Sequence, residues 1–223
     1  MKQINKLNEP NSLVEHRAKE HSNFDNIPLK VKEQLKENLL SEQGFICCYC
    51  MKRIPENNPP NLKVEHFSCQ ADNHHLQLTY SNLFASCTGN EGQTKIKQTC
   101  DTKKANSVLT INPIYNPPNC ETLFKFNSEG EISSLIENAD INRQINEVLN
   151  LNMQSLKDNR REVYLEVQRN VENESRKLGS KQLKLSYFEK EKNKWLTRID
   201  NKFKPFCMVA VYLLTKKIKQ YQI

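Results

Sequence analysis

The pattern of hydrophobic and polar positions begins with a polar stretch that leads into one helix. Residues 1–27 are polar and contain turn-forming groups without a clear period. After Pro28, leucine and valine recur at helical spacing, and Gly44 supplies a stop signal. The pattern therefore predicts an N-terminal helical segment within residues 1–44.

The stretch that follows is typical of short strands and turns. Residues 45–66 predict a cysteine-bearing knuckle followed by a hairpin, in which "RIPENNPPN" forms the turn and "LKVEHF" is the returning strand. Further along, "TLFKFNSEGEI" predicts a second hairpin with "NSEG" at its turn. We expect a compact core over residues 45–110 and a hairpin or linker over residues 111–138.

From residue 139 the pattern becomes helical. An amphipathic stripe continues to about residue 171, and apolar positions from Trp195 to Phe203 indicate another helix. "PFCMVAVYLLTKKIKQY" predicts a last, largely apolar helix that starts at Pro205. The expected fold class is α+β and mostly helical, with residues 139–223 as a basic helical C-terminal region.

Positive charge is concentrated in the C-terminal third of the chain. The net charge is +7, and residues 151–223 hold 17 Lys and Arg against 8 Asp and Glu, so the remainder is slightly acidic. Nucleic acid or an acidic protein partner would explain such an excess. A solvated, lysine-rich helical surface explains it equally well.

The apolar segments are too short to predict a membrane helix. The longest, "FCMVAVYLL", falls below the ~18 residues that a span needs, and the N-terminus lacks the apolar core of a secretory signal. We therefore expect a cytoplasmic protein with no membrane association. In that compartment, paired cysteines are more often metal ligands or catalytic groups than disulfides.

The chain has 8 cysteines, and three of them fall within "CCYC". Cys47 and Cys50 form a C-x-x-C pair, and Cys87 and Cys100 form a looser second pair. Four thiolates in two separated pairs suit a tetrahedral structural zinc site. Buried cysteines without a metal are the alternative, and Cys48 could replace Cys47 as a ligand. The other three cysteines are interpreted as small apolar residues: Cys69, Cys120 and Cys207.

Polar residues follow the cysteine pairs in a particular order. "VEHF" places Glu65 and His66 at the end of a predicted strand, and "SNLFASC" places Asn82 five residues before the third cysteine of the set. "CDTKKAN" places Asp101 directly after the fourth. This order resembles the HNH endonuclease motif, the ββα-metal fold, in its zinc-stapled form.

The resemblance implies a role for each of these residues. His66 would be the general base, and Asn82 would hold the loop. Glu65 and Asp101 would bind a catalytic divalent metal, although the family more often has aspartate at the first position and histidine or asparagine at the second. The first turns of the following helix carry two candidate phosphate contacts that could equally be solvated: Lys103 and Lys104.

These residue types suit the hydrolysis of a phosphodiester. A neutral imidazole can take a proton from water near pH 7, and a hard cation can neutralise charge on the phosphate and the leaving oxygen. Two carboxylates with few further protein ligands favour magnesium over zinc. We therefore expect structural zinc in the cysteines and magnesium or a similar ion at Glu65 and Asp101.

The order of the motifs narrows the resemblance. "LLSEQGFICCYCMKRI", "VEHF", "LTYSNLFASCTGN", "CDTKKAN", "NPIYNP" and "FKFNSEGEI" are similar, over roughly residues 5–170, to the PtuB-like HNH family of retron and Septu anti-phage defence. This implies an effector nuclease that cuts DNA or RNA and works with a PtuA-like ABC/SMC ATPase. In retrons, a reverse transcriptase and its noncoding RNA–DNA product would restrain it. Residues 171–223 match least well.

Two other functions stay open. The chain could be an inactive zinc-knuckle module that binds nucleic acid or protein, or an enzyme held inactive until a partner releases it. The intact trio of Glu65, His66 and Asp101 favours an active enzyme, since a degenerate domain usually loses one of them. The sequence does not distinguish duplex DNA, single strands and tRNA as substrates.

Overall fold

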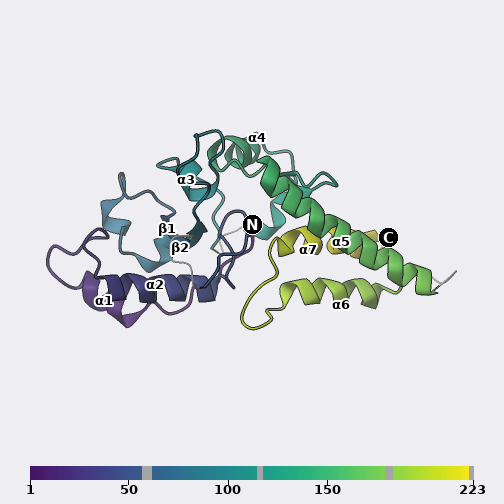
Figure 1. The fold of residues 1–223 in the computed structure, drawn as a ribbon, viewed down its shortest axis with the longest axis horizontal. Coiled ribbons are helices and arrows are strands. Elements are labelled where there is room, and N and C mark those ends of the chain that lie inside the picture. The colour runs from purple at the N-terminus through teal and green to yellow at the C-terminus, as the bar shows by residue number, and fades with distance from the viewer. Residues whose placement is uncertain (57–61, 115–117, 179–182, 221–223) are drawn as a thin grey trace.

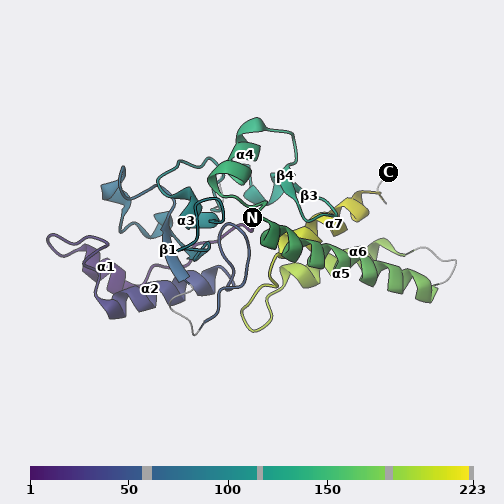
Figure 2. The same cartoon turned by 45° about the horizontal axis from the view of Figure 1, so that its top comes forward.

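The structure, a computed structural model, describes residues 1–56, 62–114, 118–178 and 183–220. In both views the N-terminal helices and the first strand lie at one end of an elongated molecule, and three long C-terminal helices lie at the other (Figures 1 and 2). The main elements, in chain order, are α1 (Asn11–Arg17), α2 (Leu29–Glu42), β1 (Leu62–His66), β2 (Leu83–Cys87), α3 (Cys100–Lys104), β3 (Phe124–Phe126), β4 (Ile132–Ser134), α4 (Ala139–Arg143), a π-helical turn (Gln144–Val148), α5 (Gln154–Leu178), α6 (Leu185–Leu196) and α7 (Cys207–Gln220).

Helix α2 confirms the first prediction from the pattern. It begins directly after Pro28 and buries its leucine face, including Leu35 and Leu39. It ends just before Gly44, which has a φ of +59° and continues the chain in the left-handed region. Proline at the start and glycine past the end are the ordinary boundary signals of a helix.

The predicted hairpin over residues 45–66 is wrong in its pairing. Strand β1 exists, but it pairs antiparallel with β2, in a register that joins Leu62 to Cys87 and His66 to Leu83. The knuckle instead closes on itself through an isolated bridge between Ile46 and Arg53. Alternation of apolar and polar residues predicts a strand but does not predict which other strand it pairs with. The local pattern therefore could not identify β2 as the partner of β1. The predicted turn lies partly outside the described residues.

Helix α3 follows β2 and packs on it, so two antiparallel strands and a short helix succeed one another. At five residues, α3 is too short to be stable alone. The backbone N–H of Cys100, at its start, donates to the carbonyl of Leu149, which ties the helix to the C-terminal half.

The second predicted hairpin is confirmed. β3 pairs antiparallel with β4, and Gly130 in the turn has a φ of +75°. The turn rests on α5, where the buried Arg160 side chain donates from Nε to the Gly130 carbonyl at 2.6 Å.

The C-terminal helical region is more broken than its pattern predicts. A π-helical turn and a short loop interrupt the stripe between α4 and α5, and α6 stops at Leu196. The chain after α6 crosses to the end of α2 instead, where Arg198 donates to the carbonyls of Ser41 and Glu42 at 2.9 and 2.6 Å. Helix α7 starts at Cys207, two residues after the predicted proline.

One buried hydrophobic cluster joins these parts, from the first residues to α7. Its continuity means that the predicted segment boundaries do not separate independent cores along the described chain. None of the helices in these ranges is both long enough and apolar enough to pass through a bilayer.

Substituting Gly130 tests how the hairpin seats on α5. An added Cβ would lie 2.0 Å from the carbonyl oxygen of Lys157, so Gly130→Ala is expected to lower the free energy of unfolding by more than about 2 kcal/mol. Gly92→Ala is the matched control, because Gly92 also has a positive φ but faces open space. Urea unfolding should show a larger decrease in the free energy of unfolding for Gly130→Ala than for Gly92→Ala. Equal decreases would mean that the close contact with the Lys157 carbonyl does not affect stability.

Candidate metal centre and active site

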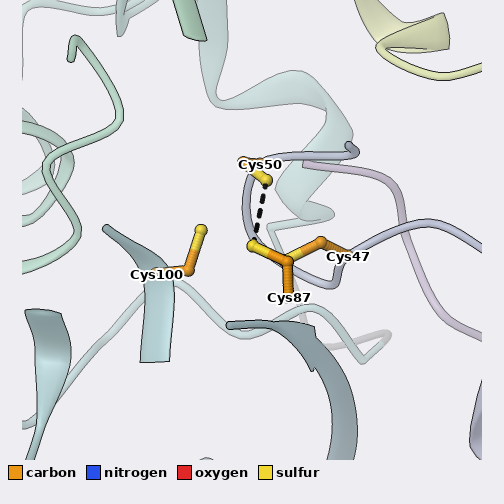
Figure 3. Close-up of side chains that lie close together, drawn as sticks. All are labelled: Cys47, Cys50, Cys87 and Cys100. Atoms are coloured by element: carbon orange, nitrogen blue, oxygen red, sulfur yellow. Dashed lines mark hydrogen bonds between the residues drawn. The ribbon is translucent and has the colours of Figure 1, made fainter. Parts of the chain in front are cut away.

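Four cysteine side chains converge on one point. Cys47 and Cys50 come from the knuckle, Cys87 ends β2, and Cys100 begins α3; their sulfur atoms all lie within 4.8 Å of one another (Figure 3). The sulfurs of Cys50 and Cys87 are 3.8 Å apart. Four Zn–S bonds of about 2.3 Å in a tetrahedron put sulfurs about 3.8 Å apart, whereas a disulfide needs about 2.05 Å. The set therefore fits one zinc ion.

The knuckle backbone sets this geometry. The N–H of Cys47 donates to the Lys52 carbonyl, and the N–H of Met51, a residue with a φ of +65°, donates to the Cys47 carbonyl. The N–H of Lys52 also points at the sulfur of Cys50, at 3.4 Å. Cys48 is not part of the sulfur group, so the geometry favours Cys47 in the C-x-x-C pair.

Electrostatics at the sulfurs favour a cation. Burial acts to raise the pKa of Cys47, but hydrogen bonds from the other thiols, first that of Cys100, hold its pKa well below the ordinary value. The same contacts raise the pKa of Cys100 well above it. The first cysteine to lose its proton is therefore stabilised as a thiolate, whereas a second thiolate beside it is disfavoured. A divalent cation would offset the repulsion between these negative charges and bind all four cysteines as thiolates.

Arg160 is a buried cation beside this centre that the sequence did not single out. Its guanidinium donates to the carbonyls of Gly130 and Leu151, at 2.6 and 2.8 Å, and no described carboxylate forms an ion pair with it. Burial lowers the pKa of Arg160 to about 10, whereas charge at Cys50 and Cys100 acts in the opposite direction. Zinc with four thiolates is a net anion, so it would stabilise this cation.

Glu65 lies in the interior, next to the cysteine centre. Its side chain is 1% exposed, and its Oε1 accepts the Tyr49 hydroxyl at 2.6 Å and pairs with Lys104 Nζ at 2.8 Å. Burial is the largest cause, and the neighbouring Asp101 carboxylate the next, of a pKa well above the ordinary value for Glu65. Glu65 and Asp101 both line one open cavity, so two acidic groups share it.

His66 is the next residue on β1 and turns its ring toward the following loop. Its Nε2 is 3.0 Å from the carbonyl oxygen of Gln77, and its ring meets the edge of Phe24 with centroids 4.4 Å apart. Burial lowers the pKa of His66, although the Gln77 carbonyl works against this shift. The ring is thus held in place and biased toward the neutral form.

Asn82 ties the loop after β1 to the start of β2. Its Oδ1 accepts the N–H of Ser68 at 2.8 Å, and its Nδ2 donates to the carbonyls of Ser68 and Leu76 at 3.0 and 3.3 Å. The side chain is buried. Asn82 therefore fastens this loop at Ser68 and Leu76.

Asp101 sits on α3 at the edge of an open cavity of about 420 Å³, which Glu65 and His66 also line. Its Oδ2 pairs with Lys63 Nζ at 3.1 Å. Among the residues that the structure describes, only the four cysteines have ligand atoms close enough together to hold a metal ion without rearrangement. The trio of Glu65, His66 and Asp101 shares the cavity without converging to that degree.

The two lysines expected near phosphate lie in different places. Lys103 is half-buried, and its Nζ donates to the carbonyl of Lys95 at 3.1 Å. Lys104 is 1% exposed, and its Nζ lies between Glu65 and the His66 carbonyl, at 2.8 and 3.0 Å. That placement does not support a phosphate contact for Lys104, because its ammonium is enclosed by protein. Lys63, on the cavity wall, is the lysine that the motif did not indicate.

His74 and His75 are exposed in a short 3₁₀ turn, as expected of surface residues. Cys69 lies in the cavity wall, with its thiol 3.1 Å from Asp72, and Cys120 and Cys207 are buried in the core.

Comparison with known proteins finds no matching family model. "Retron Vc95 putative HNH endonuclease" of Vibrio cholerae serotype O1 biovar El Tor is 31% identical over 106 residues, 46% of this chain and 48% of the relative. "Retron Ec83 putative HNH endonuclease" of Escherichia coli is 29% identical over 121 residues, 47% of this chain and 46% of the relative. The chain spans about half the length of these curated relatives.

Both similarities support the HNH endonuclease family and so confirm the resemblance that the motifs indicated. The narrower assignment to PtuB-like proteins and the ATPase partner remain predictions, as does a cytoplasmic location.

Removing one sulfur distinguishes a zinc site from ordinary buried cysteines. Cys47→Ala is expected to reduce the zinc content of purified protein from about one ion per chain to almost none, and to destabilise the fold strongly, because metal binding and folding are coupled. Cys48→Ala is the matched control, since Cys48 is its buried neighbour outside the group and should keep full zinc content. Equal zinc content in the two variants, measured by elemental analysis, would rule out this ligand set.

Proposed function

We propose that the chain is a metal-dependent HNH nuclease that hydrolyses phosphodiester bonds in nucleic acid. One observation carries the proposal: a histidine fixed by a hydrogen bond and two carboxylates line one open cavity, and Asp101 directly follows a member of the four-cysteine group. The names of the two relatives support the same activity and add a retron context.

His66 is the proposed general base. An Nε2–H that donates to the Gln77 carbonyl leaves the lone pair on Nδ1, and this atom would take the proton from the attacking water. The lowered pKa keeps the ring neutral at physiological pH, as a base requires. Asn82 would keep the loop that carries Gln77 in position through its three hydrogen bonds to that loop.

Glu65 and Asp101 are the proposed holders of the catalytic cation. Both carboxylates line the cavity, and Asp101 contributes to the raised pKa of Glu65. Carboxylate oxygens are the ligands that a hard divalent ion such as magnesium prefers. When bound, that ion would neutralise charge on the scissile phosphate and the leaving oxygen. Zinc in the cysteines would hold the knuckle, β2 and α3 together.

The setting of the nuclease is part of the proposal. We infer an effector of a retron or Septu type of anti-phage defence, acting with a PtuA-like ATPase and, in a retron, restrained by a reverse transcriptase and its RNA–DNA product. The basic excess of residues 151–223 would suit either nucleic acid or such a partner. An inactive binding module is the second candidate, and the enclosed Glu65–Lys104 pair favours it, because that pair would also serve a purely structural core.

Replacing His66 tests the catalytic role. His66→Ala is expected to reduce magnesium-dependent cleavage by about 10²–10⁴-fold, the usual contribution of a general base. His74→Ala is the matched control, since this exposed histidine lies on the neighbouring loop and should leave cleavage unchanged. Plasmid, single-stranded DNA and tRNA should each be tested, alone and with the products of the adjacent genes. A His66→Ala protein as active as the parent would end this assignment.

The pH dependence of cleavage follows from the direction of the His66 shift. The base is active when neutral, so kcat/KM should be flat at neutral pH and fall as pH decreases through the pKa. Since burial lowers that pKa, the midpoint is expected below the ordinary histidine value of about 6.5. An acidic limb with its midpoint above that value would contradict the geometry.

A further inference from the structure

Tyr49 connects the knuckle to the cavity. It stands between Cys47 and Cys50, and its side chain is 1% exposed. Its hydroxyl donates to Oε1 of Glu65 at 2.6 Å, across the boundary between the knuckle and β1. No feature of the sequence singled out this residue, since a tyrosine inside C-x-x-C can equally be a packing residue.

The Glu65 carboxylate is held from two sides. Lys104 approaches Oε1 at 2.8 Å from α3, the helix that begins at Cys100. Tyr49 approaches the same oxygen from the segment that carries Cys47 and Cys50. Both donors therefore belong to segments that the sulfur centre joins, and the position of the carboxylate depends on where that centre places them.

The pattern of donors also decides which oxygen stays available. Within the described chain, the recorded hydrogen bond and ion pair both use Oε1, and neither uses Oε2. A carboxylate fixed through one oxygen presents the other in one direction. A cation that meets a fixed ligand loses less free energy to ordering than one that must fix the ligand itself.

We propose that Tyr49 is a positioning residue for the catalytic cation, because its hydroxyl orients Glu65 so that the second carboxylate oxygen faces the ion shared with Asp101. The proposal rests on the nuclease function above. On this proposal one side chain, Tyr49, connects the structural zinc site to the catalytic metal site. Phenylalanine at position 49 would fill the same space, but it would leave the buried carboxylate with one donor fewer.

The structure offers a matched control elsewhere. Tyr80 donates its hydroxyl to Oε2 of Glu42, also at 2.6 Å, and both side chains are buried. That pair joins α2 to the turn before β2 and does not line the cavity. Tyr49→Phe and Tyr80→Phe therefore remove the same kind of hydrogen bond, and only the first removes it from the cavity.

The experiment measures Mn²⁺ binding to zinc-loaded protein by the loss of the free Mn²⁺ electron paramagnetic resonance signal. Tyr49→Phe is expected to weaken Mn²⁺ binding by about tenfold, as for a lost hydrogen bond to a charged group, while its zinc content stays at the parent level. Tyr80→Phe should bind Mn²⁺ as the parent does. In cleavage assays, Tyr49→Phe should raise the magnesium concentration for half-maximal rate more than it lowers the maximal rate.

A double-mutant cycle keeps the result specific. In a Glu65→Gln background, Tyr49→Phe should weaken Mn²⁺ binding no further, because the orienting effect acts through Glu65. Parent-like Mn²⁺ affinity in folded Tyr49→Phe would overturn the proposal, as would equal weakening in Tyr80→Phe. Loss of zinc or of the fold in Tyr49→Phe would also overturn it, by showing that Tyr49 holds the knuckle. A parent protein that neither binds Mn²⁺ nor cuts nucleic acid would instead contradict the nuclease function itself.

Discussion

Four sulfur atoms from three separate segments meet at one point next to the cavity, since Cys100 directly precedes the cavity residue Asp101. The knuckle supplies two of them, and the end of β2 and the start of α3 supply one each. Neither a two-stranded sheet nor a five-residue helix is stable alone in water. A metal ion bound by the four sulfurs would join these segments and add to the stability that they gain from the shared hydrophobic cluster. The same junction places Glu65, His66 and Asp101 along one cavity.

Several charged side chains near the four sulfurs are buried. Glu65 and Lys104 form an enclosed pair, each 1% exposed, and Arg160 is buried, with no ion pair to a carboxylate among the residues that the structure describes. Removing one member of such an arrangement leaves an uncompensated buried charge, which costs several kcal/mol. A four-thiolate zinc centre would add negative charge near Arg160 to that of Glu131, and it would connect α5 to the site through charge as well as through packing.

The parts that the sequence predicts well are those that local pattern decides. The helix after Pro28, the strand at "LKVEHF" and the hairpin with "NSEG" at its turn each depend on neighbouring residues, and all three are present. The cysteine set could also be found, since spacing and order suffice to indicate a metal site. Helix α6 ends early because Arg198 binds the end of α2, a contact that no local pattern encodes.

Long-range contacts also explain what was missed at the site. The partner of β1 lies seventeen positions further along the chain, and the choice between Cys47 and Cys48 depends on how the knuckle turns. Lys104 looks like a surface residue in sequence, yet the fold encloses it against Glu65. Tyr49 acquires its partner only when the knuckle folds over β1.

The most direct test of the account is anomalous diffraction from crystals grown with zinc and soaked in Mn²⁺, recorded at both metal edges. The account predicts a zinc peak about 2.3 Å from each of the four sulfurs, and a separate manganese peak in contact with Asp101 and Glu65 beside the His66 ring. A structure with no zinc among the sulfurs, or with manganese bound only away from Asp101, would contradict it.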